Sequence, residues 1–184
     1  MAEMKTSTVE SLLGVLSIGP MSGYEMRQFM ERSTANFWSE SYGQIYPALK
    51  KMLAEGLVAV EERDGEGHPA KKVYRLTEAG EMRLREWLAV PVQPHRHRIE
   101  LLLKVFFGSR AEPGVIAAQV ELWRKRYASD LERYLEIEQI IPTIDEGNPG
   151  LPFFLMTVRY GIAEARALVG WCEETLLELA KLSG

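Results

Sequence analysis

Several features that would assign this chain to a familiar class are scarce or missing. The sequence of 184 residues contains one cysteine, Cys172, so an intrachain disulfide is excluded and a reducing compartment is favoured. No apolar run reaches the roughly 18–20 residues that a membrane-spanning helix needs. The N-terminus also lacks the basic and then apolar order of a secretion signal. We therefore expect a cytoplasmic protein with no membrane partner.

Catalytic motifs are missing as well. The sequence contains no HExxH, no Gly-x-Ser-x-Gly, no P-loop and no GxGxxG after a strand. His95 and His97 are separated by one residue, but no cysteine and no evident third ligand accompany them, as a zinc site would require. We predict no enzymatic activity, no catalytic residues, no cofactor and no metal site.

The balance of charge excludes a uniformly basic nucleic-acid-binding protein. The net charge is −4, and the first 90 residues hold 11 Lys and Arg against 13 Asp and Glu, a net of −2. Binding to DNA would therefore require the cations to gather on one face. Scattered cations would instead favour an alternative function, a protein-interaction module that does not bind DNA.

The most informative stretch runs from Ser39 to Gly56 and predicts a helix with two distinct faces. Ser41 is the expected N-cap, with Gln44 as its partner in a capping box, and Gly56 is the expected left-handed stop. The spacing of the apolar residues predicts one buried face, formed by Ile45, Leu49, Met52 and Leu53. The opposite face is polar, aromatic and cationic, with Tyr42, Gln44, Tyr46, Lys50 and Lys51.

The segments around this helix predict a small helical domain with a β-hairpin. Capping boxes at 7–10 and 22–25 are expected to open two earlier helices, and Phe37 and Trp38 are expected core residues. Strands are predicted at 57–61 and 72–77, joined by a turn at 64–69 that is too long for a two-residue hairpin. Thr77 is expected to cap a fourth helix.

The second half of the sequence predicts only helices. A short helix is expected at about 98–107, then a long one with Pro113 in its first turn, a turn at 142–149, and a last helix at about 151–182. Cys172 lies on the apolar stripe of the last helix, which predicts a buried, inert thiol. Two such long helices cannot bury both apolar faces within one small monomer, so we predict a homodimer.

Several motifs together resemble the PadR family of transcriptional regulators. They are Pro20-Met-Ser-Gly-Tyr-Glu25, Phe37-Trp38, Ser41, Gly43-Gln-Ile-Tyr-Pro47, Leu49, Glu55-Gly-Leu57 and Tyr74-Arg-Leu-Thr77 with Gly80. The match covers about residues 9–89, and residues 95–182 resemble the longer helical C-terminal domain of one branch of that family. One departure is Gly67-His68-Pro69, where the family's wing commonly carries Gly-Arg-Pro; histidine makes a weaker, pH-dependent phosphate contact than arginine.

The resemblance implies a mainly α fold with two domains. Residues 1–90 would form a winged helix-turn-helix of three helices and a two-stranded wing, and residues 95–184 an all-helical dimerisation and effector domain. The implied function is a dimeric repressor of nearby genes, released from DNA by a small aromatic effector. Its partner would be a double-stranded, partly palindromic operator read by two copies of the recognition helix.

The predicted DNA contacts differ in role. Gln44 is the best candidate for reading a base edge, with adenine as its bidentate partner, and Tyr42 would pack on a thymine methyl or donate to phosphate. Lys50 and Lys51 would hold phosphates. Ser22 and Tyr24 would contact phosphate at a helix N-terminus; alternatively, the box only caps its helix and Tyr24 is a core residue. The full predicted set is Ser22, Tyr24, Ser41, Tyr42, Gln44, Tyr46, Lys50, Lys51, His68, Lys71 and Lys72.

Two further groups have two open interpretations each. His68, Lys71 and Lys72 would form a cationic wing, or would only keep a hairpin tip soluble beside several carboxylates. An effector pocket would be lined by Phe106, Phe107, Trp123 and Tyr127. Aromatic residues at helical spacing are, however, more often ordinary core or dimer interface.

Overall fold

The structure is a computed structural model that describes residues 3–35, 37–65, 68–92, 98–144 and 147–182. Side chains are described for these residues except 3–7, 63–65, 68–70 and 142–144. The chain divides into two compact units, Met1–Pro94 and His95–Gly184.

The fold is mainly α, as predicted. The first unit contains α1 (Glu3–Leu16), α2 (Gly23–Ser33), α3 (Tyr42–Ala54), β1 (Val58–Gly65), β2 (His68–Leu76) and α4 (Glu78–Ala89). The second contains α5 (Glu100–Phe106), the short 3₁₀ turn η1 (Gly108–Arg110), α6 (Val115–Ile144) and α7 (Leu151–Leu182).

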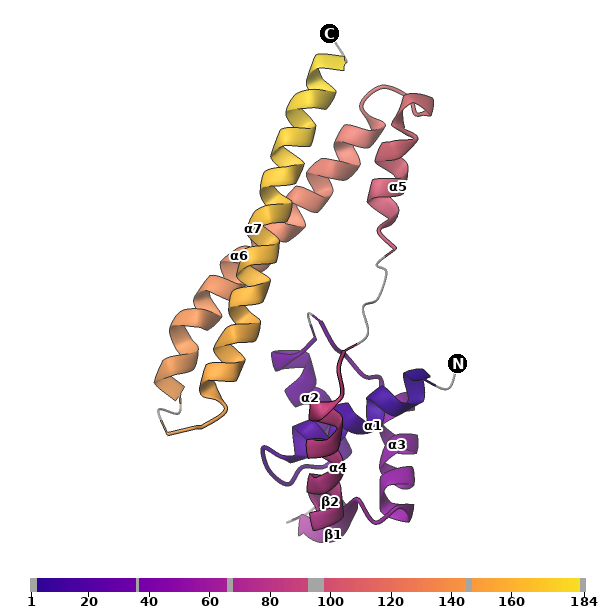
Figure 1. Ribbon diagram of the computed structural model, residues 1–184, viewed down its shortest axis with the longest axis vertical. Helices are drawn as coiled ribbons and strands as arrows, with labels where there is room; N and C mark the ends of the chain where they lie inside the picture. Colours follow the sequence, from indigo (N-terminus) through magenta and orange to yellow (C-terminus); the bar gives the residue numbers. More distant parts are fainter. Residues whose placement is uncertain (1–2, 36, 66–67, 93–97, 145–146, 183–184) are drawn as a thin grey trace. The chain divides into compact units, whose positions relative to one another are not determined.

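In the first unit, helices α1, α2 and α3 enclose one apolar core, and the antiparallel pair β1–β2 follows α3 (Figure 1). The core side chains recur at helical spacing, for example Leu12, Leu13 and Leu16 on α1 and Ile45, Leu49 and Met52 on α3. At its end, α3 closes as predicted: Gly56 has a φ of 69°, and the N–H of Leu57 bonds back to the carbonyl of Met52 at 2.9 Å. Because the apolar side chains of α3 pack on the core, its predicted polar face points outward.

Two sequence-based expectations for the first unit are wrong. The box at 7–10 does not open a helix, since α1 already begins at Glu3; the Glu10 carboxylate is buried and accepts from Arg83 instead. Phe37 and Trp38 are not core residues, being 56% and 41% exposed. The indole N–H of Trp38 donates to Glu40 at 3.0 Å, which holds the ring near the surface.

The hairpin is also longer than predicted. Pairing continues from Val58 opposite Leu76 to Gly65 opposite His68, with a register shift between Arg63 and Gly65. The segment read as a long turn therefore extends both strands. Residues with turn chemistry are tolerated there because a shift in register accommodates them without ending the pairing.

The second unit is built around the antiparallel pair α6 and α7 (Figure 1). The backbones approach closely at Gly161, where a Cβ would lie 3.0 Å from the ring of Tyr134. Two predicted details are wrong here. Pro113 precedes α6 rather than lying in its first turn, because Gly114 adopts a φ of 80°, and Pro142 lies within α6 rather than in the following turn.

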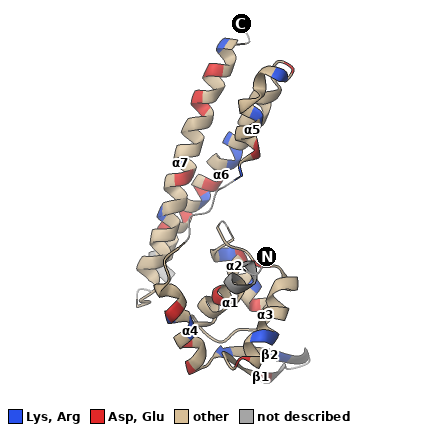
Figure 2. Cartoon of the chain, turned by 45° about the vertical axis from the view of Figure 1, so that its right-hand side comes forward, with Lys and Arg blue, Asp and Glu red and all other residues tan. Residues whose placement is uncertain are grey.

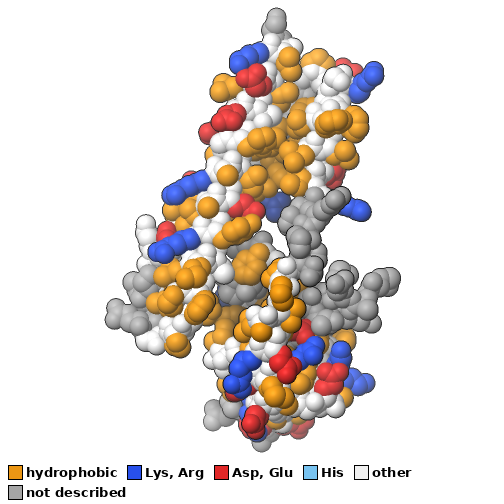
Figure 3. Space-filling model, in the orientation of Figure 1, with side chains coloured by type: hydrophobic (Ala, Val, Ile, Leu, Met, Phe, Trp, Pro, Cys, Tyr) orange, Lys and Arg blue, Asp and Glu red, His pale blue; other side chains and the backbone are white. Residues whose placement is uncertain are grey.

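Large apolar side chains remain exposed on the two long helices, as the orange areas in Figure 3 show. The exposed set includes Leu122, Ile140, Phe153, Met156, Tyr160 and Leu177. By contrast, few apolar side chains described in this unit are buried: a small core of Leu101, Ile116, Val120 and Cys172, together with Ile162 and Ala165 on α7. None of the described helices is long and apolar enough to cross a membrane.

Candidate nucleic-acid interface

The predicted recognition face of α3 is accessible in the first unit. Gln44, Lys50 and Lys51 are exposed, Tyr46 is 50% exposed and Tyr42 is half-buried. We call this set, together with Tyr24 on α2, the α3 surface. Tyr24 is 54% exposed, so the alternative that it is a core residue is wrong.

Three tyrosines of the α3 surface form a stack that joins α2 to α3. The rings of Tyr24 and Tyr42 lie 6.4 Å apart and nearly parallel, and those of Tyr42 and Tyr46 lie 6.1 Å apart. The guanidinium of Arg27 covers the Tyr42 ring at 4.1 Å from its centroid. Gly23 approaches the stack so closely that a Cβ there would lie 2.9 Å from the Tyr46 ring. The stack therefore presents aromatic edges and hydroxyls with little freedom to move.

Gln44 has a second role that limits how it can read a base. Its side-chain oxygen accepts from the Ser41 N–H at 3.0 Å and from the Ser41 hydroxyl at 2.7 Å. Bidentate recognition of adenine needs that oxygen as an acceptor as well as the amide as a donor. In the free protein, Gln44 therefore offers its amide donor, while its oxygen is engaged in the cap.

The box at Ser22 forms as predicted and extends to the hairpin. The Ser22 N–H and hydroxyl donate to Glu25, the Glu25 N–H donates to the Ser22 hydroxyl, and the Lys71 ammonium binds the Glu25 carboxylate. Ser22 is 6% exposed, so its hydroxyl is not available at the surface. The hydrogen bond from Lys71, followed by that from the Ser22 backbone, lowers the pKa of Glu25 to about 2.

Most cations around the α3 surface already have carboxylate partners. Lys51 pairs with Glu55 at 3.7 Å, Arg27 with Glu31 at 2.7 Å and Lys72 with Glu62 at 3.9 Å. Figure 2 shows basic and acidic residues interspersed over this unit. Within the part of the chain described, Lys50 is the cation of the α3 surface that forms no ion pair, so it is the one most readily available to a phosphate.

Sequence reasoning missed Arg27 and Gln28. Arg27 stacks on Tyr42, and the Gln28 side-chain amide donates to the Tyr24 hydroxyl at 2.8 Å. The signal was present, because residues 24, 27 and 28 share one face of a helix. It could not be interpreted without knowing that this face lies beside α3. His68, the third member of the predicted wing cluster, has its side chain outside the described residues.

The depressed pKa of Glu25 predicts a specific acid sensitivity. Stability contributed by the ionised Glu25 is fully present above its ordinary pKa and is lost as the pH falls toward about 2. Denaturant unfolding measured at pH 7, 4.5 and 2.5 should therefore show that the wild type is more stable than Glu25→Gln at pH 7, and that this difference in the free energy of unfolding shrinks as the pH falls. The effect should be small, since the side chain is 42% exposed and screened by solvent. A difference that stays constant with pH would contradict it.

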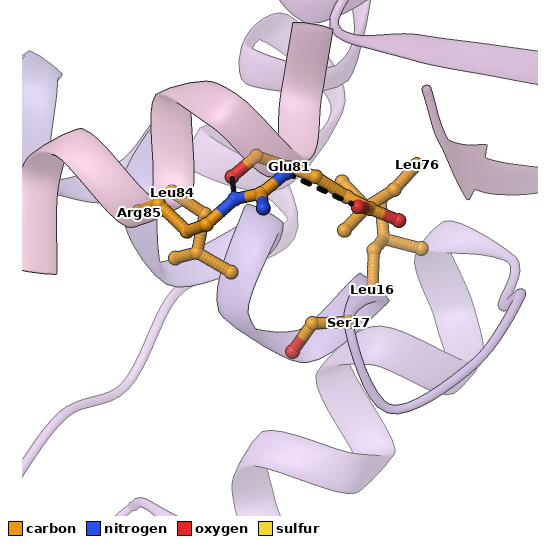
Figure 4. A pocket seen from close by; sticks show the side chains of 6 residues that line it. All are labelled: Leu16, Ser17, Leu76, Glu81, Leu84 and Arg85. Carbon is orange, nitrogen blue, oxygen red and sulfur yellow. Dashed lines mark hydrogen bonds and ion pairs between the residues drawn. The ribbon is translucent and has the colours of Figure 1, made fainter. Parts of the chain in front are cut away.

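The four predicted effector residues form two separate pairs. Phe106 and Phe107 meet edge to face at 5.0 Å, and Trp123 and Tyr127 at 5.5 Å. Phe106 is 80% exposed, while Trp123 packs against the small core. A shallow pocket elsewhere, shown in Figure 4, lies between α1, β2 and α4 and is lined by none of the four: its residues are Leu16, Ser17, Leu76, Glu81, Leu84 and Arg85.

Two further predictions concern reactive groups. Cys172 is fully buried as predicted, and burial raises the pKa of its thiol, which disfavours the reactive thiolate. Among the described residues, no three metal-ligating side chains gather into a group. His95 and His97 lie outside those residues.

Comparison with known families matches both halves of the chain. Residues 12–86 match the model of the transcriptional regulator PadR-like family. Residues 97–180 match the model named virulence activator alpha C-term. The first match spans α2, α3, the hairpin and most of α4, and so includes the whole α3 surface.

Individual proteins are similar over nearly their full length. The negative transcriptional regulator PadR of Bacillus subtilis is 28% identical over 177 residues, covering 93% of this chain and 96% of the relative. The structure of that protein with operator DNA has a TM-score of 0.81 at 24% identity and covers 93% of this chain and 98% of the other. Its structure with p-coumaric acid has a TM-score of 0.74, also at 24% identity, and covers 93% of this chain and 97% of the other. The Vibrio cholerae virulence activator AphA has a TM-score of 0.75 at 26% identity, covering 95% and 99%.

Proposed function

We propose that the chain is a transcriptional regulator of the PadR-like family, and that it acts in the cytoplasm as a homodimeric repressor that binds operator DNA through the α3 surface. The observation that carries this proposal is the exposed, rigid set of donors on α3. A helix held on an apolar core, with tyrosines, an amide and a lysine that no described carboxylate pairs facing outward, has the dimensions and chemistry needed to enter a major groove.

Each part of the surface has a distinct role in this proposal. Lys50 and the tyrosine hydroxyls bind phosphates and set the register, while Gln44 contacts a base edge through its free amide. Full bidentate reading of adenine would draw the Gln44 oxygen out of the cap. Because most neighbouring cations are paired with carboxylates, the salt dependence of binding should be shallow for a DNA-binding protein.

The exposed apolar side chains of α6 and α7 support dimerisation through the second unit. A stable monomer rarely leaves so many large apolar groups uncovered, and a second copy is the simplest partner. The dimer would place two α3 surfaces on a partly palindromic site, with half-site centres about 34 Å apart.

A mobility-shift titration against the DNA upstream of its own gene tests the proposal. The wild type should bind that DNA more tightly than shuffled DNA of equal length, whereas Gln44→Ala should lose about tenfold of this preference, the value of one good base contact. Gln44→Ala should also lower the stability of the folded protein by about 1 kcal/mol, because it removes the side chain that completes the capping box with Ser41. Equal affinity of the wild type for both DNAs would refute the function.

Release by a small aromatic molecule is the regulatory part of the proposal. It is supported by the likeness in fold to Bacillus subtilis PadR, whose structure has been determined with p-coumaric acid. Adding p-coumaric acid to the same titration should weaken operator binding. If that compound and related phenolic acids leave binding unchanged, regulation by this class of effector is excluded while the DNA-binding function stands.

One observation favours a second candidate, a protein-interaction module without DNA binding. The cations near the α3 surface alternate with carboxylates instead of forming one basic ridge (Figure 2). Under this alternative, the wild type would retain no DNA at low salt, where electrostatic binding is strongest.

A further inference from the structure

A buried carboxylate, Glu40, lies directly before the N-cap of α3 and has no part in the interface described above. Glu40 is 7% exposed. One oxygen accepts from the Thr8 hydroxyl at 3.2 Å, and the other accepts from the Trp38 indole N–H at 3.0 Å and from the Ser11 hydroxyl at 3.4 Å. All three donors are neutral, although burying a carboxylate is costly unless its hydrogen bonds are well satisfied.

These bonds connect the three helices of the helix-turn-helix. Thr8 and Ser11 belong to α1, while Trp38 belongs to the connection between α2 and α3. Trp38 is itself tied to the end of α2: its N–H donates to the Thr34 carbonyl at 2.7 Å, and the Thr34 hydroxyl donates to the Trp38 carbonyl at 2.9 Å. A continuous hydrogen-bonded path therefore runs from α2 through Trp38 and Glu40 to α1, and Glu40 directly precedes the cap of α3.

Apolar packing alone does not fix the orientation of α3 to the accuracy that base reading needs. The contacts of Ile45 and Leu49 with the core are non-directional, so they define the orientation of the helix less sharply than hydrogen bonds do. Hydrogen bonds are directional, and a recognition group must be held within about 0.5 Å of its productive position. Lysine side chains are long enough to follow a small rotation and still reach a phosphate, whereas Gln44 cannot follow one and still meet a base edge.

We propose that Glu40 is a positioning residue for sequence recognition, which fixes the orientation of α3 relative to α1 and α2 without contacting DNA itself. The inference rests on the proposed function. Its consequence is specific: loss of Glu40 reduces the preference for operator over other DNA, while general affinity for DNA is retained.

The test measures this preference by fluorescence anisotropy in folded protein, as the dissociation constant for the shuffled duplex divided by that for the operator duplex. Glu40→Ala should lower the ratio about tenfold and change binding to the shuffled duplex less than about twofold. Glu40→Gln should keep most of the preference, because its amide oxygen can still accept from Trp38 and its amide N–H can donate to the Thr8 hydroxyl.

Glu10 provides a matched control. It is a second buried carboxylate of the same unit, but it lies on α1, binds Arg83 of α4 at 2.9 Å and is not part of the path to α3. Glu10→Ala should therefore lower stability and leave the ratio unchanged. If Glu40→Ala does not fold, the double variant Thr8→Val with Ser11→Ala is used instead. It removes both hydroxyls of α1 that donate to Glu40, and it should lower the ratio as well.

An unchanged ratio in the folded variant overturns the proposal, as does an equal loss in Glu40→Gln or in Glu10→Ala. These outcomes presuppose that the wild type prefers its operator. A wild type without that preference refutes the proposed function and the role of Glu40 together, so the two failures are distinguishable.

Discussion

Gly80→Ala should lower the free energy of unfolding of the first unit by about 2–3 kcal/mol, the cost of forcing an extra group into a packed site. A Cβ at Gly80 would clash with the backbone carbonyl oxygen of Leu57. That oxygen cannot move freely, since it accepts the Thr77 N–H at 3.2 Å, and the Thr77 hydroxyl in turn donates to Gly56 at 2.7 Å. The substitution would separate the start of α4 from the end of α3.

Thermal unfolding followed by circular dichroism measures this effect, with an expected drop in Tm on the order of 10 °C for a unit of this size. Gly14→Ala is the matched control, because Gly14 lies in α1 and a Cβ at that position would meet nothing within 4 Å. Replacing a glycine inside a helix with alanine should raise stability by about 0.5–1 kcal/mol. Equal Tm values for the two variants would show that α4 does not approach Leu57 as described.

Lys50→Glu should weaken specific DNA binding on the order of 100-fold. A dimer would lose two phosphate contacts and gain two anions that face the DNA backbone, and like charges at an interface cost several kcal/mol. DNA binding should be most sensitive to substitution of Lys50, because this lysine is exposed and forms no ion pair among the described residues. Its charge is therefore not already neutralised by a carboxylate, as that of Lys51 is by Glu55. The milder Lys50→Ala should reduce the slope of log affinity against log salt by about 1.8 per dimer.

Arg85→Glu is the control for Lys50→Glu. It makes the same change in net charge on α4, outside the α3 surface, where Arg85 is 71% exposed and pairs with Glu81 at 3.5 Å. Anisotropy titrations at 100 mM salt should show DNA affinity close to wild type for this variant. A similar loss in both variants would mean that net charge, and not the α3 surface, governs binding.

The sequence predicted α3 well because the signals that define it are local. Ser41 and Gln44 lie at capping-box spacing, the apolar residues recur at spacings of three and four, and Gly56 ends the helix, so every determinant falls within the helix and its caps. The same holds for α7, whose bounds at Leu151 and Leu182 follow from an uninterrupted apolar stripe.

The parts that were missed depend on contacts between distant segments. Trp38 is expected in the core because it is large and apolar, but its ring stays 41% exposed while its indole N–H donates to the buried Glu40 carboxylate. The ion pair of Lys71 with Glu25, 46 positions away in the sequence, could not be foreseen either, and the predicted contact of Lys71 with DNA stays a prediction. Glu10 and Glu40 could not be predicted as buried, since carboxylates are seldom buried and nothing local identifies their partners.

The most direct test of the central claim is the stoichiometry of binding to the operator duplex, titrated at a protein concentration well above the dissociation constant. If two copies present paired α3 surfaces to one partly palindromic site, the titration should saturate sharply at two chains per duplex. Saturation at one chain per duplex, or no saturable binding, would contradict it.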